Sequence, residues 1–427
     1  MNNLFVLYFL FLPFQFALSP VSGVDLASIR LLTLFLFLVW LSRGLIQRRI
    51  LLPKLLPLFL FSGFLFIALG SFLWSEHIVL ALRKTLFLFS FAPLFIILAS
   101  WFEEQRSARL VVLTSFVAGA FLSAITGIFF FLSQFIFGVE RVFSFLIGSV
   151  LPFFLGTTFA QSVAEYPSLL VNISGMTVLR ASGIFPDPHM FSIFIGMALP
   201  LALVFFLQAT APYKKYWGIV FMGILIGDLL SFSRGAYVAL LGAMVVALFA
   251  SGRMSYFSLR QKWAGFIFGM VVLAMLASSP IGTRFFSSFS QDDGSNIERL
   301  RLWQEAVYHV SERPFFGVGL GNYAITVHPG ASSRDPIYAH NLFLDIAVEI
   351  GLVGLFFFVA LLGVATLGLW NSWKREHNRL AFGALISLSI LSIHSLFETP
   401  LFSVHVLPGL LLLLSLGVSY IYDKKNT

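Results

Sequence analysis

The chain has 427 residues, of which 59% are hydrophobic, only 11% are charged, and none is cysteine. A soluble domain carries about 25% charged residues, so this composition excludes a water-soluble globule, which would lack the polar surface to cover itself. The absence of cysteine excludes disulfides, thiolate nucleophiles and cysteine-ligated metal sites. The formal charge of +8 could suit nucleic acid. Its basic residues lie in short segments between apolar blocks, however, so we interpret the charge as a signal of membrane topology and expect no nucleic-acid partner.

Apolar blocks of about 20 residues recur along the chain, and a helix of that length crosses roughly 30 Å of hydrocarbon. Inside lipid the backbone must satisfy its own hydrogen bonds, so such blocks form helices; barrel strands would alternate apolar and polar residues. The sequence predicts an all-α fold in which residues 1–427 form one polytopic membrane helix bundle, with about 12 transmembrane helices and one large external loop. The predicted spans are 4–19, 29–47, 55–73, 78–100, 109–136, 188–208, 215–232, 235–250, 264–280, 342–369, 380–397 and 404–422.

Basic residues set the predicted sidedness. One set of inter-span segments is rich in lysine and arginine, and the positive-inside rule places it in the cytoplasm together with both termini. The block 4–19 lacks a basic n-region and a cleavage site, so we expect a retained first helix. The cytoplasmic set is Arg43, Arg48, Arg49, Lys54, Arg106, Arg109, Lys214, Lys215, Arg253, Arg260, Lys262, Lys374, Arg375, Arg379, Lys424 and Lys425, and the opposite short connections hold Arg30, Arg141, Arg180 and Arg234.

Two longer segments are then external. Residues 137–187 must start and end outside, so their apolar part, 142–160, forms either a re-entrant hairpin or a helix at the outer interface. Residues 281–341 form a large periplasmic loop. In that loop Asn296 could cap a helix that ends before Pro314, with one apolar face. That face would contain Ile297, Leu300, Trp303, Val307 and Val310.

A glycine-rich stretch follows this helix, with Gly317, Gly319 and Gly321 after Phe-Phe. No lysine follows, which argues against a nucleotide phosphate loop. A tight turn at the membrane surface and a direct anion site both fit the pattern.

Ionisable groups at or near membrane depth are costly, so each raises a functional hypothesis. Arg180, Asp187 and His189 lead into a span, where they could belong to an ordinary interfacial loop or to a site. Arg234 lies in a tight Ser-Arg-Gly turn between spans. It could snorkel to lipid headgroups, or it could bind phosphate oxygens beside two serine hydroxyls and a helix start.

The loop helix carries two arginines, Arg299 and Arg301. They are two residues apart and cannot share one helical face, so at most one points at a buried site. A solvated loop charge is the stronger interpretation for Arg301.

The longest span begins at His340 and Asn341, and Asn341, Asp345 and Glu349 form one stripe at i, i+4 and i+8. The two carboxylates must face other polar groups. A histidine at the top could act as a base near neutral pH, although a lone histidine at a helix start is usually structural.

Weaker candidates complete the polar set. Snorkelling explains Arg83 and Lys84 most simply, while His394 and Glu398 could line the same external vestibule. No histidine pair has zinc spacing and no acidic cluster resembles a calcium or magnesium cage, so we expect no metal and no cofactor.

Taken in order, these residues resemble the O-antigen ligase and polymerase superfamily over about half of the chain. The resemblance consists of an R-x-S-G-x-F segment, an S-R-G turn, an R-L-x-L-W stretch, a P-x-x-G-x-G-x-G stretch, and H-N leading into a helix with E-x-G. Its residues are Arg180, Ser182, Gly183 and Phe185; Ser233, Arg234 and Gly235; Arg299 and Trp303; Pro314, Gly317, Gly319 and Gly321; and His340, Asn341, Glu349 and Gly351.

The resemblance implies an inverting, metal-independent glycosyltransferase of the GT-C type in the bacterial inner membrane, working on its periplasmic face. Its donor would be a glycan on undecaprenyl diphosphate. By position, Arg234 and Arg299 match diphosphate-binding arginines and His340 matches the base. Arg180 is a further diphosphate candidate, and Arg301 is adjacent to the motif position.

The acceptor stays open. A ligase transfers the glycan to lipid A-core, whereas a polymerase transfers it to a second lipid-linked glycan; the protein-glycosylating branch often has an added C-terminal domain, and this chain ends at Thr427, just after its last span. A lipid-linked glycan transporter is the competing class. It would favour paired halves and sites at mid-membrane, whereas the polar candidates here gather at one face. A structural scaffold would leave the arginines and the histidine unexplained.

Overall fold

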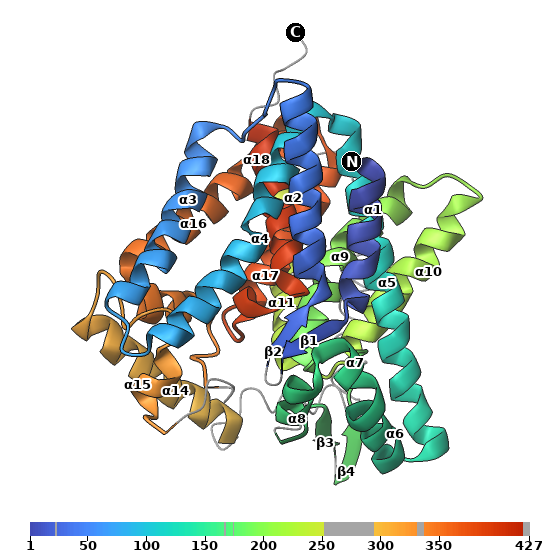
Figure 1. The fold of residues 1–427 in the computed structure, drawn as a ribbon. Helices are drawn as coiled ribbons and strands as arrows, with labels where there is room; N and C mark the ends of the chain where they lie inside the picture. The colour runs from blue at the N-terminus through green and yellow to red at the C-terminus, as the bar shows by residue number, and fades with distance from the viewer. Residues whose placement is uncertain (22–23, 166–167, 174, 252–293, 331–336, 422–427) are drawn as a thin grey trace.

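The computed structural model describes residues 1–21, 24–165, 168–173, 175–251, 294–330 and 337–421, and these are almost entirely helical (Figure 1). Within those ranges the strands form two antiparallel hairpins. The first pairs β1 (Ala17–Val21) with β2 (Val24–Ala27), and the second pairs β3 (Leu170–Ile173) with β4 (Met176–Leu179). The prediction of a helical membrane protein is confirmed, with these two small hairpins added to it.

Seven helices of the described residues are long and apolar enough to cross a membrane, which makes this a multi-pass protein. They are α2 (Ser28–Ile46), α3 (Leu55–Gly70) with the 3-10 turn Ser71–Leu73, α4 (Ile78–Glu104), α5 (Arg106–Phe137), α9 (Pro188–Gln208), α11 (Arg234–Ser251) and α16 (Leu342–Glu376). The shorter helices α1 (Asn2–Phe11), α17 (Arg379–His394) and α18 (Val406–Ile421) are also apolar, and α10 spans Tyr213–Leu229. The predicted span 264–280 lies outside the described residues, and the number of 12 stays a prediction.

The predicted first span, 4–19, is wrong at its C-terminal end. Helix α1 ends at Phe11, a 3-10 turn covers Leu12–Phe14, and the chain continues as β1. Pro13 has no N–H for a helical hydrogen bond, and hydropathy alone does not register this interruption. The hairpin that follows lies against the segment 137–187, because Nε2 of Gln15 donates to the carbonyl of Phe154 at 3.0 Å.

The described part of the segment 137–187 is a run of short helices followed by the β3–β4 hairpin, and a re-entrant or interfacial place for its apolar part, 142–160, stays a prediction. It contains α6 (Val139–Phe145), a π-helix (Leu146–Val150), α7 (Leu151–Leu155) and α8 (Thr157–Glu165). Each is too short to cross a membrane. Gly138 and Gly156 interrupt the run at positive φ, +85° and +90°, where other residues would be strained.

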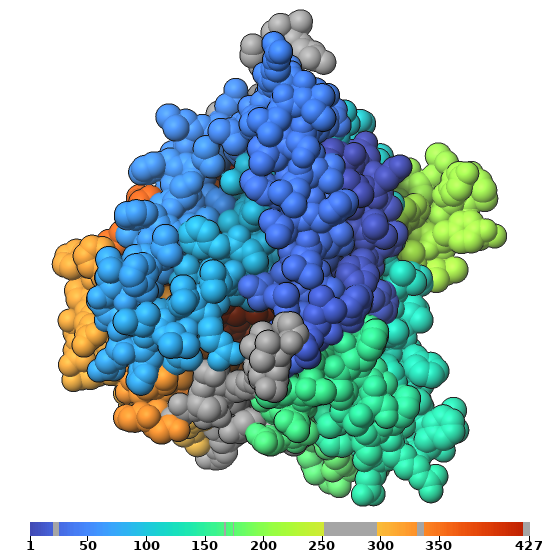
Figure 2. Space-filling model, in the orientation of Figure 1, coloured from blue at the N-terminus to red at the C-terminus, as the bar shows by residue number. Residues whose placement is uncertain are grey.

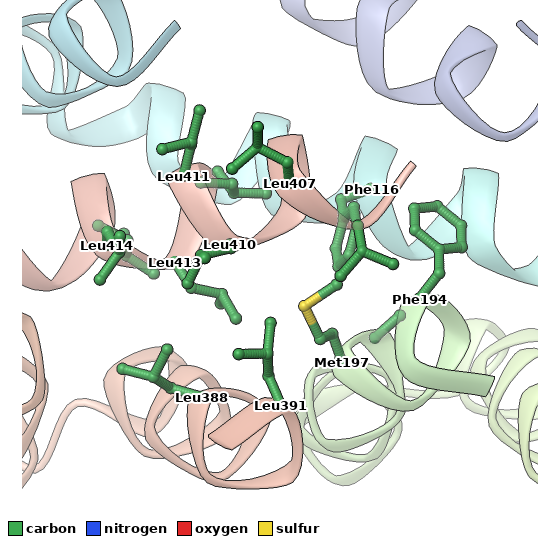
Figure 3. Packing of buried hydrophobic residues seen from close by; sticks show 14 of the residues in the cluster. Phe116, Phe194, Met197, Leu388, Leu391, Leu407, Leu410, Leu411, Leu413 and Leu414 are labelled. Carbon is green, nitrogen blue, oxygen red and sulfur yellow. The ribbon is translucent and has the colours of Figure 1, made fainter. Parts of the chain in front are cut away.

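Helix α18 is the centre of the bundle. All of its residues from Val406 to Tyr420 are buried, as expected for a helix that is apolar on every side. In Figure 3 its leucines pack between α5, α9 and α17. The labelled contacts are Leu407, Leu410, Leu411, Leu413 and Leu414 of α18 against Phe116, Phe194, Met197, Leu388 and Leu391.

The two ends of the bundle differ in chemistry. At one end, the guanidinium of Arg43 lies over Trp101 and that of Arg109 over Tyr420, and the Trp101 indole donates to Asn2. This is the end where α1 begins and α18 finishes. Figure 1 shows the two hairpins, α14 (Gly294–Glu312) and α15 (Tyr323–Val327) at the opposite end. The separation follows the charge asymmetry of the loops.

Glycine allows α16 and α18 to approach closely. A Cβ atom on Gly368 would overlap the carbonyl of Gly417, and one on Gly417 would overlap that of Ala365. Small residues of this kind let helix backbones pack directly in membranes. Gly363 of the same helix α16 has open space around the position of a Cβ atom.

We expect Gly368→Ala to destabilise the protein by about 1–3 kcal/mol, because the methyl group forces the two helices apart. Gly363→Ala is the matched control and should be neutral or slightly stabilising, since alanine favours a helix over glycine. The measurement is thermal unfolding of both variants in detergent. Equal melting temperatures for the two variants would contradict the close crossing.

Candidate active site

A buried carboxylate, Glu398, is the centre of the polar cluster at the end of the bundle that carries α14. It lies between α17 and the 3-10 turn Pro400–Phe402 and is 6% exposed. Its Oε1 accepts from Nη2 of Arg299 at 3.1 Å, and its Oε2 lies 3.3 Å from Nδ1 of His340. Nδ1 of His189 is 3.6 Å from Oε1. One carboxylate thus joins α9, α14 and the start of α16.

His340 is held by the chain on both sides. It has a left-handed backbone, φ +48°, and the next residue, Asn341, caps α16 by accepting from the N–H groups of Phe343 and Leu344. The preceding Ala339 donates to Asp345 at 2.9 Å and accepts from the indole of Trp303 at 2.8 Å. The backbone that carries the His340 imidazole is therefore held in place at the start of α16.

The same helix start is tied to the turn that carries Glu398. The N–H of Leu342 donates to the carbonyl of Ser395 at 2.8 Å, and Asp345 accepts from the hydroxyl of Thr399. These bonds hold the His340 and Glu398 segments in register. Asp345 is consequently a positioning group, and Asn341 is a helix cap.

Arg299 and Arg301 diverge on α14. Arg299 reaches Glu398, and its side chain is 19% exposed. Arg301 is 43% exposed and pairs with Glu298 one turn earlier, at 2.6 Å. Of the two, Arg299 is the one that points at a buried site.

The predicted start of α14 is wrong, and its predicted apolar face is right only in part: Trp303 and Val310 pack against a buried cluster. The helix begins at Gly294, so Asn296 is inside it. Leu302 and Ala306 are the buried residues, whereas Ile297, Leu300 and Val307 are exposed. Apolar side chains occur on several sides of this helix, so periodicity alone could not select the face that docks.

The glycine-rich stretch serves packing against a break in α16. Ile350 and Gly351 leave helical geometry, and the N–H groups of Val318 and Gly319 donate to the carbonyls of Val348 and Glu349, both at 2.9 Å. A Cβ atom on Gly317 would overlap the carbonyl of Val348. The glycines thus allow the loop to replace the missing helical hydrogen bonds, which favours the turn interpretation over direct anion binding.

Glu349 forms a buried ion pair with Lys84 of α4, at 2.7 Å. Snorkelling is therefore the wrong explanation for Lys84, which turns inward to neutralise a carboxylate 265 residues away in sequence. Nζ of Lys84 also lies 4.5 Å from the ring of Phe402. The pair joins α4 to the end of the bundle that carries the site.

A second group of polar side chains lies on the α9 and α11 side of Glu398. Asp187 caps α9 by accepting from the N–H groups of His189 and Met190. Nδ1 of His189 lies 3.0 Å from Oγ of Ser233, and the same hydroxyl is 3.4 Å from Nε2 of His394. The turn before α11, which contains Ser233, is thereby linked to both α9 and α17.

Arg234 is the first residue of α11, next to Ser233, and it is buried. A Cβ atom on the following Gly235 would lie 2.7 Å from the His394 ring, so only glycine lets the turn approach α17. Burial at a helix start makes lipid-headgroup snorkelling a poor explanation for Arg234.

Arg180 is also buried, and two of its nitrogens donate to backbone carbonyls. Nε donates to Ser231 at 2.7 Å and Nη1 to Ser168 at 3.0 Å. The N–H of Ala181 donates to the carbonyl of Leu230. Arg180 therefore ties the segment before α9 to the turn that presents Arg234.

The cluster shifts the pKa of its own members. Burial lowers the pKa of His340, but the charge and the hydrogen bond of Glu398 outweigh it, so the net shift is upward. Burial would raise the pKa of Glu398, but the neighbouring His189, His340 and Arg299 lower it well below its usual range. Burial raises the pKa of Asp187 to about 6 against the opposing effect of its cap hydrogen bonds. Glu398 is thus an anion and a strong acceptor.

Sequence reasoning ranked Glu398 and His394 below the motif residues. The available signal was a glutamate at the predicted external end of an apolar span, where a buried carboxylate needs a counter-charge. Among the described residues, no group of three or more His, Cys, Asp or Glu side chains is arranged to hold a metal ion.

Residues 219–359 of the chain match the O-antigen ligase family. This range includes Ser233, Arg234, Arg299 and His340, while His189 and Glu398 lie outside it. No curated protein sequence matches the chain. This match over residues 219–359 confirms the resemblance to the O-antigen ligase and polymerase superfamily seen in the motifs.

Proposed function

We propose that this protein is an inverting, metal-independent glycosyltransferase that moves a glycan from an undecaprenyl-diphosphate carrier to an acceptor hydroxyl. The observation that carries the proposal is the pair His340–Glu398, a histidine oriented by a buried carboxylate beside arginine. A base held by a third group is the arrangement that activates hydroxyl nucleophiles.

In this mechanism Glu398 accepts the Nδ1 proton of His340, which leaves the Nε2 lone pair for the acceptor hydroxyl. Among the described residues Nε2 of His340 makes no hydrogen bond, and the side chain is 30% exposed. The raised pKa makes His340 a stronger base than a free imidazole. As the hydroxyl attacks, Nε2 takes its proton.

The leaving group is a diphosphate, and negative charge grows on it as the glycosidic bond breaks. Fixed guanidinium groups stabilise that charge without having to reorient. Arg299 and Arg234 are the residues we assign to this role. Arg180 contributes indirectly, since it holds the turn from which Arg234 extends.

A lipid-linked donor needs a lateral entrance. Figure 2 shows a hollow between α4 and the β1–β2 hairpin, with atoms from the C-terminal part of the chain at its floor. On the same helix α4, Lys84 and Phe87 contact Phe402. A cation beside aromatic rings suits the amphipathic head of such a donor.

By the charge asymmetry of the loops, the site belongs on the periplasmic face of the bacterial inner membrane, with both termini cytoplasmic. Transfer to lipid A-core (ligase) is our first choice, and transfer to a second lipid-linked glycan (polymerase) is the alternative within the superfamily. A lipid-linked glycan transporter is the competing class.

The first test uses protein purified in detergent, an undecaprenyl-diphosphate-linked glycan and EDTA. We expect acceptor-dependent release of undecaprenyl diphosphate, and the acceptor that works distinguishes ligase from polymerase. His340→Ala should lower the rate by about 10²–10⁴-fold, because the base is lost. Donor movement across liposomes without release under any acceptor would instead establish the transporter.

Arg299→Gln and Arg301→Gln form a matched pair on one helix. We expect Arg299→Gln to lower kcat by about 10²–10³-fold, as removal of a group that stabilises developing charge does. Arg301→Gln should stay within about twofold, since an exposed ion pair contributes little. Turnover and melting temperature are measured together, because loss of Arg299 also leaves Glu398 with fewer partners. Equal losses in both variants would contradict the assignment.

The pH profile tests the link between Glu398 and His340. A base must be neutral to act, so kcat/KM should rise with pH through the His340 pKa, at a midpoint above the ordinary histidine value. Glu398→Gln removes the attraction that raises this pKa, so the rising limb should move to lower pH while the plateau falls. A limb that stays in place in Glu398→Gln would show that another group titrates.

A further inference from the structure

Two imidazoles direct the same nitrogen at one carboxylate, yet their surroundings differ. Nδ1 of His340 lies 3.3 Å from Glu398, and Nδ1 of His189 lies 3.6 Å from it. His189 has a closer neighbour, the hydroxyl of Ser233 at 3.0 Å. If this hydroxyl donates to Nδ1 of His189, the proton of the neutral ring lies on Nε2, and Nε2 is then a hydrogen-bond donor.

The Ser233 hydroxyl has three neighbours. Its Oγ lies 3.0 Å from Nδ1 of His189, 3.4 Å from Nε2 of His394, and accepts from the N–H of Ala236 at 3.4 Å. A hydroxyl has one proton and two acceptor positions. With one acceptor position used by Ala236, Ser233 must accept from one ring and donate to the other.

His394 settles which ring donates. Its Nδ1 is buried and has no hydrogen-bond partner within the described part of the chain. A proton on Nδ1 would leave a buried N–H unsatisfied, which proteins avoid more strictly than a bare acceptor. The proton of a neutral His394 therefore lies on Nε2 and is donated to Ser233.

The consequence passes to His189. Ser233 then donates to Nδ1 of His189, so that nitrogen carries a lone pair and a neutral ring carries its proton on Nε2. Oε1 of Glu398, at 3.6 Å, is beyond hydrogen-bond distance from Nδ1 and already accepts from Arg299. A second positive charge next to Arg299 would also be unfavourable in a buried site.

We propose that Ser233 and His394 hold His189 in the Nε2–H tautomer, which makes it a hydrogen-bond donor to the diphosphate of the glycan carrier. This role rests on the proposed transferase function. The His189 side chain is 22% exposed, and its Nε2 has no hydrogen-bond partner among the described residues. The ring can therefore reach a ligand beside Arg299.

His189 and His340 then have opposite roles around Glu398. His340 donates Nδ1–H to the carboxylate and receives the acceptor proton on Nε2. When the glycosidic bond breaks, its electron pair goes to the diphosphate oxygen. His189 stabilises that oxygen through its N–H and keeps its own proton. The base, His340, has its proton on Nδ1, whereas the donor, His189, has its proton on Nε2.

The direct test is nitrogen NMR of ¹⁵N-histidine-labelled protein in detergent, in which a protonated ring nitrogen is distinguished from a bare one. The chain has 8 histidines, and single His→Gln variants assign the signals. We expect protons on Nε2 of His189 and His394. A His189 signal with its proton on Nδ1, or on both nitrogens, overturns the proposal.

Ser233→Ala removes the donor to Nδ1 and should shift the His189 signal toward the other tautomer, while Ser233→Thr, which keeps a hydroxyl, should restore it. Ser231→Ala in the same turn is the control, because that hydroxyl donates to the carbonyl of Asp228 and accepts from the N–H of Ser233 but contacts neither ring. The spectrum of the wild-type protein decides the question if Ser233→Ala does not fold.

Activity gives a second readout. We expect His189→Leu to lower kcat by about 10²-fold, and His189→Gln, which keeps an N–H donor, to recover most of the loss with little change in KM. If the transferase activity is present but His189 carries Nδ1–H, this inference fails alone. If the tautomers are as proposed but no glycan is transferred, the proposed function fails and the proton arrangement stands.

Discussion

The site depends on one buried anion. Removing a carboxylate from water is costly unless charge and hydrogen bonds replace the lost solvation. Glu398 satisfies this requirement with a guanidinium from α14 and the imidazole of His340 at the start of α16. These elements are distant in sequence. The need to neutralise one carboxylate therefore constrains where each of them lies in the folded chain.

A second buried pair extends the same principle to the scaffold. Glu349 lies directly before the break in α16, and Lys84 of α4 neutralises it. The glycine-rich stretch supplies the hydrogen bonds that the break removes. The part of α16 that starts at Asn341 is thereby held as a separate segment, and His340 at its end has a defined position relative to Glu398.

Hydropathy predicted apolar helices whose form the lipid environment determines. It did not predict local interruptions or contacts between side chains that are distant in sequence. The span 188–208 was predicted with both ends correct, because a block of apolar residues between Pro188 and Gln208 has no other stable form in lipid. The first span failed at Pro13, where a local backbone constraint outweighs average apolarity. The pairing of Lys84 with Glu349 and the central place of Glu398 are contacts across the folded chain, and no local pattern contains them.

The distribution of the site over the chain explains why its motifs are informative but incomplete. The region matched to the O-antigen ligase family contributes Arg234, Arg299 and His340. The carboxylate that contacts Arg299 and His340 lies after α17, and the neighbouring imidazole of His189 lies at the start of α9. Helix α18 is packed between α9 and α17 and against α16. The helices that carry His189, Glu398 and His340 therefore share one core. The matched domain therefore cannot form this arrangement alone: Arg299 and the base require the rest of the bundle to supply the anion that orients them.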